Sequence, residues 1–208
     1  GLPHLIALED ESSSKLLERA FRKRGIKFEL GVRFKSHKVN GDSVTVTLED
    51  GREFTADVLL VSVGRGPVTD GIGYQELGIT MDRGYITVDE HCRTNIPGVW
   101  AVGDIIPTLQ LAHVGFQEGI LVAETIAGLN PRPINYDGVP RVTYSEPEVA
   151  SVGLSTKVAK ERGYDVVELD YNLAGNGKAQ ILKTAGSIKL IAEKNGPVLG
   201  IHMVGARV

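Results

Sequence analysis

Apolar and polar residues alternate with two different periods along this chain, and the periods mark its predicted elements. Apolar residues recur at helical spacing through 11–24 and again through 111–127, and each run is followed by a glycine, Gly25 or Gly128. Asp10 or Glu11 can cap the first of these helices. Such spacing, closed by glycine, is typical of amphipathic helices.

Shorter apolar segments between these helices predict strands. We expect strands at 26–30 and 32–39, a turn at 40–42, an alternating strand at 44–48 and a returning strand at 54–63. Turn residues between strands of this length indicate a β-meander. The returning strand has a fully apolar end that closes at Gly64, as expected of a strand covered on both faces.

The stretch that best predicts a site is the run Val99-Trp100-Ala101-Val102, which Gly103 and Asp104 stop abruptly. We interpret this run as a buried strand of an open parallel sheet, and ligands bind beyond the carboxyl ends of such strands. Glycine removes the side chain that would obstruct a ligand, and a carboxylate accepts hydrogen bonds from hydroxyl groups. The start of the 111–127 helix is expected to face the same cleft, where its N–H groups suit an anion or an electron-rich carbonyl.

The last third of the chain predicts a separate α+β unit beyond a connection at 129–139. Its expected elements are strands at 141–144 and 149–153, a helix at 156–162 capped by Ser155, a strand at 166–173, a loop at 175–177, and a hairpin of 187–193 with 198–204 that turns at Asn195-Gly196. Alternating segments separated by such turn residues favour an antiparallel sheet.

Composition and charge narrow the class of protein. The net charge of −3 and the lack of a basic tail argue against nucleic acid or an anionic membrane as the main partner. Apolar runs fall far below the about 18–20 residues that span a bilayer, and no charged-then-apolar leader opens the chain, so we expect a cytoplasmic location. The single cysteine, Cys92, rules out a disulfide within one chain, and we expect it to serve packing rather than redox chemistry.

The Gly103-Asp104 stretch and the helix after it resemble the flavin-binding segment of the pyridine nucleotide-disulfide oxidoreductases, and the resemblance extends over essentially the whole chain. It implies FAD and NAD as cofactors. Asp104, beside Gly103, would hold a ribitol hydroxyl of FAD, and the backbone of the helix start would meet the flavin pyrimidine edge. Gly64 would lie against NAD, with Phe34 near its adenine. The residues implied for the flavin edge are Gln110, Leu111, Ala112 and His113.

The resemblance also implies an α/β (α+β) fold in three parts. Residues 1–66 match the C-terminal half of the NAD-binding domain, with its β-meander, and residues 67–136 match the closing segment of the FAD-binding domain. Residues 137–208 match the start of a dimerisation domain. Because the opening has neither a methionine nor a signal, we expect the chain to be an internal piece that lacks an N-terminal half and a C-terminal end.

Within the family, the phrases QLAH, AGNGKA and GIHMVG look most like the members that oxidise dihydrolipoamide with NAD in 2-oxo acid dehydrogenase complexes. A homodimer and a lipoyl domain are then the implied partners. Two alternatives stay open: a relative that reduces glutathione, mercuric ion or peroxide, and a non-catalytic module that self-associates. The family's redox cysteine pair and histidine-glutamate base have no counterpart here, so no catalytic or metal-binding residue is assigned and the chain alone is expected to be inactive. The histidines that we considered are His4, His37, His91, His113 and His202.

Overall fold

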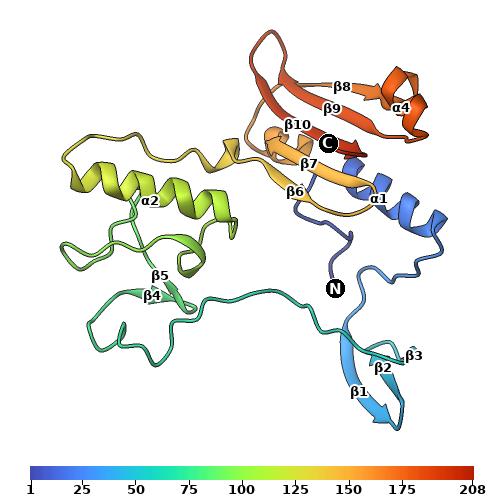
Figure 1. The fold of residues 1–208 in the computed structure, drawn as a ribbon, viewed down its shortest axis with the longest axis horizontal. Coiled ribbons are helices and arrows are strands. Elements are labelled where there is room, and N and C mark those ends of the chain that lie inside the picture. Colours follow the sequence, from blue (N-terminus) through green and yellow to red (C-terminus); the bar gives the residue numbers. More distant parts are fainter. The chain divides into compact units, whose positions relative to one another are not determined.

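The computed structural model describes residues 1–208, and the chain divides into two compact units (Figure 1). Unit 1 comprises residues 1–61 and 140–208, and unit 2 comprises residues 62–139. Mixed helices and several sheets make this an α/β (α+β) structure, as expected from the sequence.

Unit 1 contains the predicted meander, whose strands are β1 (Phe34–Asn40), β2 (Ser43–Leu48) and β3 (Glu53–Ala56). They pair antiparallel in the order β1-β2-β3. Val44 and Leu48 of β2 are buried, whereas β1 and β3 are exposed along their whole length. The predicted alternating strand and the meander around it are therefore confirmed.

Unit 1 also contains a second sheet, of five antiparallel strands (Figure 1). The predicted hairpin is present and turns at Asn195, which has φ +59°. α3 (Thr156–Glu161) begins at Ser155, whose hydroxyl accepts a hydrogen bond from the Val158 N–H at 3.3 Å. The strands of this sheet are β6 (Arg141–Thr143), β7 (Glu148–Gly153), β8 (Val166–Asn172), β9 (Ser187–Glu193) and β10 (Val198–Gly205). They pair in the order β6-β7-β10-β9-β8.

The helix α1 (Glu11–Lys23) packs against β10, where Leu17, Val149 and Val204 form a buried cluster. Its N-cap is Asp10, whose carboxylate accepts from the Ser12 N–H at 3.0 Å. The predicted cap is therefore confirmed, and so is the end of the helix before Gly25, which has φ +81°. The packing of α1 against β10 joins the first part of the chain to the sheet of the last part.

Unit 2 is built around α2 (Ala112–Ile126), the second predicted helix, which ends before Gly128. Its core contains Ile79, Ile86, Cys92, Ala101, Ile106 and Leu121. The remaining elements of the unit are short: β4 (Met81–Asp82), β5 (Tyr85–Ile86), and the 3₁₀ turns η1 (Gly103–Ile105) and η2 (Tyr136–Gly138).

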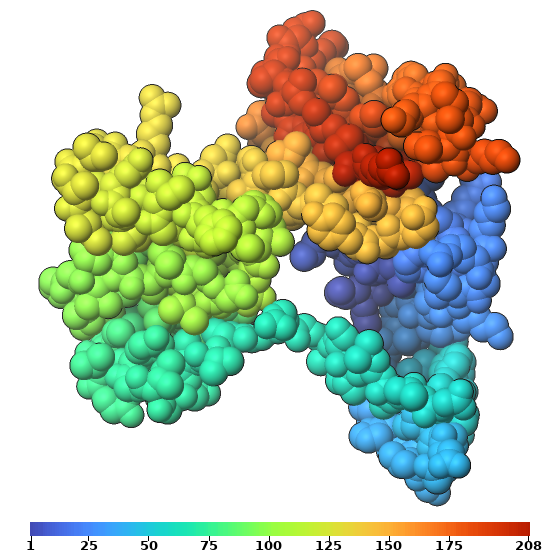
Figure 2. All heavy atoms as spheres, viewed as in Figure 1, coloured from blue at the N-terminus to red at the C-terminus, as the bar shows by residue number.

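Three of the predicted strands are absent or shortened. The segment 26–30 forms no strand, 54–63 contributes only β3, and 99–102 has a single bridge from Trp100 to Arg93. Val63 is 93% exposed, and the teal stretch of chain that follows β3 is drawn as a narrow thread in Figure 2. A parallel strand needs neighbours that bond both its edges and cover both its faces, and these 208 residues offer the segments none.

Two smaller differences concern local elements. The segment 175–177, predicted as a loop, contains the end of the 3₁₀ turn η3 (Leu173–Gly175) and the start of α4 (Gly177–Leu182). The Asn176 side chain caps α4 by accepting from the Ala179 N–H at 3.2 Å. Asparagine between two glycines is typical of both turns and helix caps, so the local sequence could not separate them.

The Asp10 carboxylate also ties three elements of unit 1 together. Besides capping α1, it accepts from the Thr156 N–H at 3.0 Å and from Lys189 Nζ at 3.1 Å. Lys189 lies 2.7 Å from Glu168 as well, and the Asp10 and Lys189 side chains are both buried. Burial by itself would raise the pKa of Asp10, but the donors around it outweigh this effect and hold the pKa well below its ordinary value.

Replacing this carboxylate should destabilise unit 1. Asp10→Asn keeps the size of the side chain but leaves buried Lys189 with one acidic partner fewer. We expect a loss of about 2–4 kcal/mol in the free energy of unfolding, measured by urea denaturation at pH 7. The control Asp170→Asn changes an exposed aspartate of β8 and should leave stability within about 0.5 kcal/mol. An equal, small effect of both substitutions would contradict this role.

The lowered pKa of Asp10 determines the pH range in which Asp10→Asn reduces the stability of the fold. A carboxyl whose pKa is lower in the folded state stabilises the fold above its unfolded pKa, about 3.9, and this contribution is lost as the pH falls through the folded value. The stability difference between the wild type and Asp10→Asn should therefore shrink on acidification below about pH 4.

Candidate functional site

Gly103 and Asp104, the residues that the sequence predicted to meet a ligand, lie in η1, which packs against α2. Gly103 adopts φ +77°, a conformation that favours glycine, and the Asp104 side chain is exposed. A Cβ added at Gly115 of α2 would lie 3.5 Å from the Gly103 Cα, so turn and helix are in van der Waals contact. The turn thus presents a free carboxylate beside the first part of the helix.

The N-terminus of α2 differs from those of the other helices in how it is capped. Leu111 is the N-cap, no side chain accepts a hydrogen bond from the first turn, and that turn contains no acidic residue. α1, α3 and α4 each have a side-chain cap, from Asp10, Ser155 and Asn176 respectively. The first N–H groups of a helix lack partners within it, so the start of α2 suits an acceptor group from outside the chain.

The predicted flavin-edge residues occupy this helix start. Ala112 and His113 are exposed in the first turn of α2, and Leu111 is half-buried. Gln110 directly precedes them, and its side-chain Nε2 is buried without an acceptor. A buried donor without a partner is uncommon, so the residues present fit a ligand that brings acceptor atoms.

Glu118, which sequence reasoning missed, connects η1 to the second turn of α2. Its side chain is fully buried, at 0% exposure, and its Oε2 accepts from the Gly103 N–H at 2.6 Å. Its Oε1 accepts from the Thr108 hydroxyl at 2.8 Å and from the Tyr136 hydroxyl at 3.0 Å. Burial and the bond to Glu118 raise the pKa of Tyr136, which therefore acts as a donor.

A signal for Glu118 was present in the sequence. Val114 and Leu121 lie on the same buried face of α2, and a glutamate between them interrupts an otherwise apolar stripe. Charged residues are almost never buried without partners, so a glutamate at such a position predicts a hydrogen-bond network.

Cys92 lies in the core of unit 2, with 2% of its surface exposed. Burial, and then the negative charges of Glu118 and Asp89, raise the pKa of its thiol to about 11. The nucleophilic form of cysteine is the thiolate, which this environment disfavours. These properties agree with the packing role that we expected.

The two residues predicted to contact NAD are both exposed and share no element. Phe34 begins β1 in unit 1, with its ring 6.3 Å from that of His37, whereas Gly64 belongs to unit 2. Gly64 has φ +133°, and no atom lies within 4 Å of the position of an added Cβ. The surroundings of each residue therefore leave room for a ligand.

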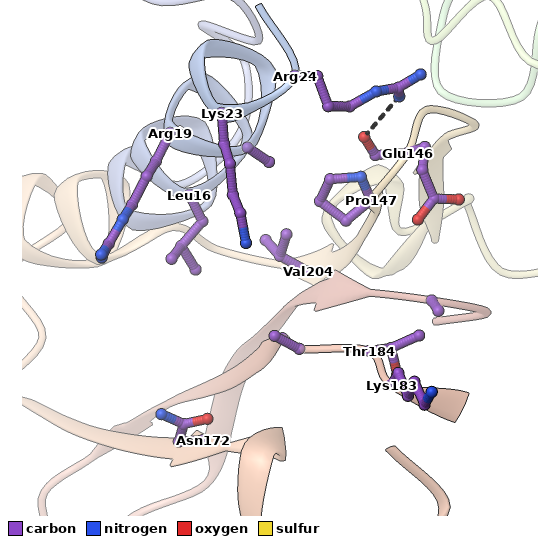
Figure 3. Close-up of a pocket in the computed structure, with 14 residues that line it drawn as sticks. Leu16, Arg19, Lys23, Arg24, Glu146, Pro147, Asn172, Lys183, Thr184 and Val204 are labelled. Carbon is purple, nitrogen blue, oxygen red and sulfur yellow. Dashed lines mark hydrogen bonds between the residues drawn. The ribbon is translucent and has the colours of Figure 1, made fainter. Parts of the chain in front are cut away.

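A hollow of about 710 Å³ in unit 1 lies between α1 and the end of β10 (Figure 3). Four basic residues line this hollow, and one of them, Arg24, donates a hydrogen bond to the Glu146 carbonyl oxygen at 3.3 Å. None of the predicted cofactor residues lines this hollow. The basic residues are Arg19, Lys23, Arg24 and Lys183.

Two further observations concern metals and membranes. The structure contains no group of three or more histidine, cysteine, aspartate or glutamate side chains placed to hold a metal ion. None of its helices combines the length and the apolar character that crossing a bilayer requires.

Comparison with known families identifies the class of protein. The family model described as pyridine nucleotide-disulphide oxidoreductase matches residues 1–119, and the model of that family's dimerisation domain matches residues 139–208. The chain therefore belongs to the pyridine nucleotide-disulphide oxidoreductase family, a family of flavoprotein oxidoreductases for which FAD and NAD(H) are the implied cofactors.

Among individual relatives, a dihydrolipoyl dehydrogenase of Bacillus subtilis is 43% identical, over 97% of this chain and 44% of its own length. A dihydrolipoyl dehydrogenase of Cupriavidus necator is 40% identical, over 99% of this chain and 45% of its own. The chain thus spans less than half the length of these curated relatives.

Solved structures show the same fold. The crystal structure of LpdA from Mycobacterium tuberculosis matches with a TM-score of 0.87 and 30% identity, over 94% of this chain and 43% of that one. The HOCl-induced flavoprotein disulfide reductase RclA from Escherichia coli matches with a TM-score of 0.87 at 24% identity, which shows likeness of fold alone.

Proposed function

We propose that these residues form part of a flavin-dependent disulfide oxidoreductase that oxidises dihydrolipoamide with NAD in 2-oxo acid dehydrogenase complexes. The observation that carries this proposal is the seating of the Gly103-Asp104 turn against the uncapped start of α2. The two relatives named above support dihydrolipoamide as the substrate, because both are dihydrolipoyl dehydrogenases.

The roles of the site residues follow from their chemistry. Asp104 would accept a hydrogen bond from a ribitol hydroxyl of FAD, with Gly103 leaving space for the chain of the ribitol. The segment 110–113 would donate main-chain N–H groups to the pyrimidine edge of the flavin, and the helix dipole favours negative charge there. FAD, when bound, supplies the electron transfer between thiols and nicotinamide. Gly64 and Phe34 would contact NAD.

The domain assignment belongs to the same proposal. Residues 1–66 would complete an NAD-binding domain, 67–136 would close an FAD-binding domain, and 137–208 would begin the dimerisation domain. The homodimer and the lipoyl domain are then its partners, in the cytoplasm. None of the 208 residues is assigned a catalytic role, since a redox disulfide needs two cysteines and the sequence has one.

Removing the Asp104 carboxylate should weaken flavin binding in an enzyme of full family length that carries these residues. A hydrogen bond to a charged group contributes about 1.5–3 kcal/mol, so Asp104→Ala should raise the Kd of FAD by about tenfold to a hundredfold. Flavin release is measured by fluorescence, with the exposed Asp70→Ala of the same unit as control. If both variants retain FAD like the wild type, Asp104 does not hold the flavin.

The 208 residues by themselves should neither bind FAD tightly nor turn over lipoamide. The main anchor for a dinucleotide is a glycine-rich turn at a helix N-terminus, and no G-x-G-x-x-G follows a strand in this sequence. Titration of FAD, followed by flavin fluorescence, should give a Kd above about 1 µM, and NADH formation should stay at the protein-free level. Submicromolar binding or measurable turnover would show that the residues carrying the site were misjudged.

The chain should self-associate through its last third, which matches the dimerisation domain. The edge strand β8 exposes Val167, Leu169 and Tyr171, which alternate and so share one face of the sheet. Exposed apolar side chains gathered on one face promote pairing. Light scattering at micromolar concentration should give at least the mass of a dimer, whereas a monomer would contradict this prediction. If an enzyme of full family length that carries these residues also dimerises without binding FAD, the non-catalytic module is favoured instead.

A further inference from the structure

The buried carboxylate of Glu118 holds both ends of the segment that carries Asp104. Oε2 accepts from the Gly103 N–H, directly before Asp104, and Oε1 accepts from the Thr108 hydroxyl, four residues after it. Between these two contacts, Ile106 is fully buried in the core of unit 2. The Asp104 side chain is thus exposed on a short loop whose two ends are fixed by one carboxylate.

The hydrogen bonds accepted at position 118 require a carboxylate rather than a side chain that only fills space. Val114 and Leu121 show that apolar residues suffice to pack this face of α2. Burying a carboxylate is costly unless donors satisfy it, and Glu118 receives three, one N–H and two hydroxyls. A glutamine would offer a single acceptor oxygen and would turn an N–H₂ group toward one of these donors.

We propose that Glu118 is a positioning residue for the flavin, because it sets the loop from which Asp104 reaches the ribitol hydroxyl. This inference rests on the proposed function. Glu118 is completely covered and acts through Gly103 and Thr108. FAD affinity should therefore depend on Glu118 only as long as Asp104 is present to make its contact.

A double-mutant cycle in an enzyme of full family length tests this dependence. Glu118→Gln should raise the Kd of FAD by about tenfold in the wild-type background. In the Asp104→Ala background the same substitution should add less than about threefold, because the contact that it misplaces is already missing. Glu124→Gln, the same exchange elsewhere on α2, should leave the Kd within about twofold.

The Kd is measured by flavin fluorescence at a temperature where circular dichroism shows each apoprotein folded, so that lost stability is not counted as lost affinity. Visible circular dichroism of the flavin, recorded at saturating FAD, should change in Glu118→Gln and not in Glu124→Gln. A purely structural role would lower the melting temperature and leave this flavin signal unchanged.

Thr108 and Tyr136 provide a matched pair if Glu118→Gln does not fold. Both donate to the same Oε1, but only Thr108 lies on the loop. Thr108→Val should raise the Kd of FAD by about threefold to tenfold, whereas Tyr136→Phe should reduce stability and change the Kd less than about twofold.

The outcomes separate this inference from the proposed function. Suppose that Asp104→Ala weakens FAD binding. If Glu118→Gln then has no effect on the Kd, or the same effect with and without Asp104, the positioning role of Glu118 is overturned, while the role of Asp104 at the flavin is still supported. Equal effects of Thr108→Val and Tyr136→Phe on the Kd would also overturn the positioning role. If neither the wild type nor its variants bind FAD, the proposed function fails first.

Discussion

The arrangement of unit 2 depends on one buried carboxylate and its three donors. Glu118 joins the turn at Gly103, the loop at Thr108 and the hydroxyl of Tyr136 to a single helix. Without it, the core cluster would still cover the apolar face of α2, but nothing polar would fix where the turn stands on that helix. A satisfied buried network is specific in a way that apolar packing is not, since its donors and acceptors must match in position.

Unit 1 also contains a buried carboxylate that connects several elements. Asp10 joins α1, α3 and β9. The five strands of the unit's antiparallel sheet pair with one another within the chain. The apolar segments around 57–63 and 99–102 behave differently, since a parallel sheet is assembled from several crossovers. The relatives are more than twice as long as this chain, and parallel partners for these segments belong in our proposal to the remainder of such a protein.

The sequence predicted the elements whose signals are local. Both long helices, the Asp10 and Ser155 caps, the meander and the hairpin at Asn195 were found from periodicity and turn residues. The predicted strands at 54–63 and 99–102 failed because a parallel strand depends on neighbours distant in sequence. Residues 103, 104 and 110–113 were correctly placed at a turn and a helix start. The glutamate on the buried face of α2 signals that a hydrogen-bond network exists, but its partners lie 10 to 18 residues away in the sequence, too far for a local pattern to identify them.

A crystal structure of a full-length enzyme carrying these residues, with FAD bound, tests the central claim most directly. Our account predicts the Asp104 carboxylate at hydrogen-bond distance from a ribitol hydroxyl and the start of α2 facing the flavin pyrimidine edge. The Gly103 N–H should still donate to Glu118. A flavin bound away from this turn, with Asp104 directed into solvent, would contradict the account.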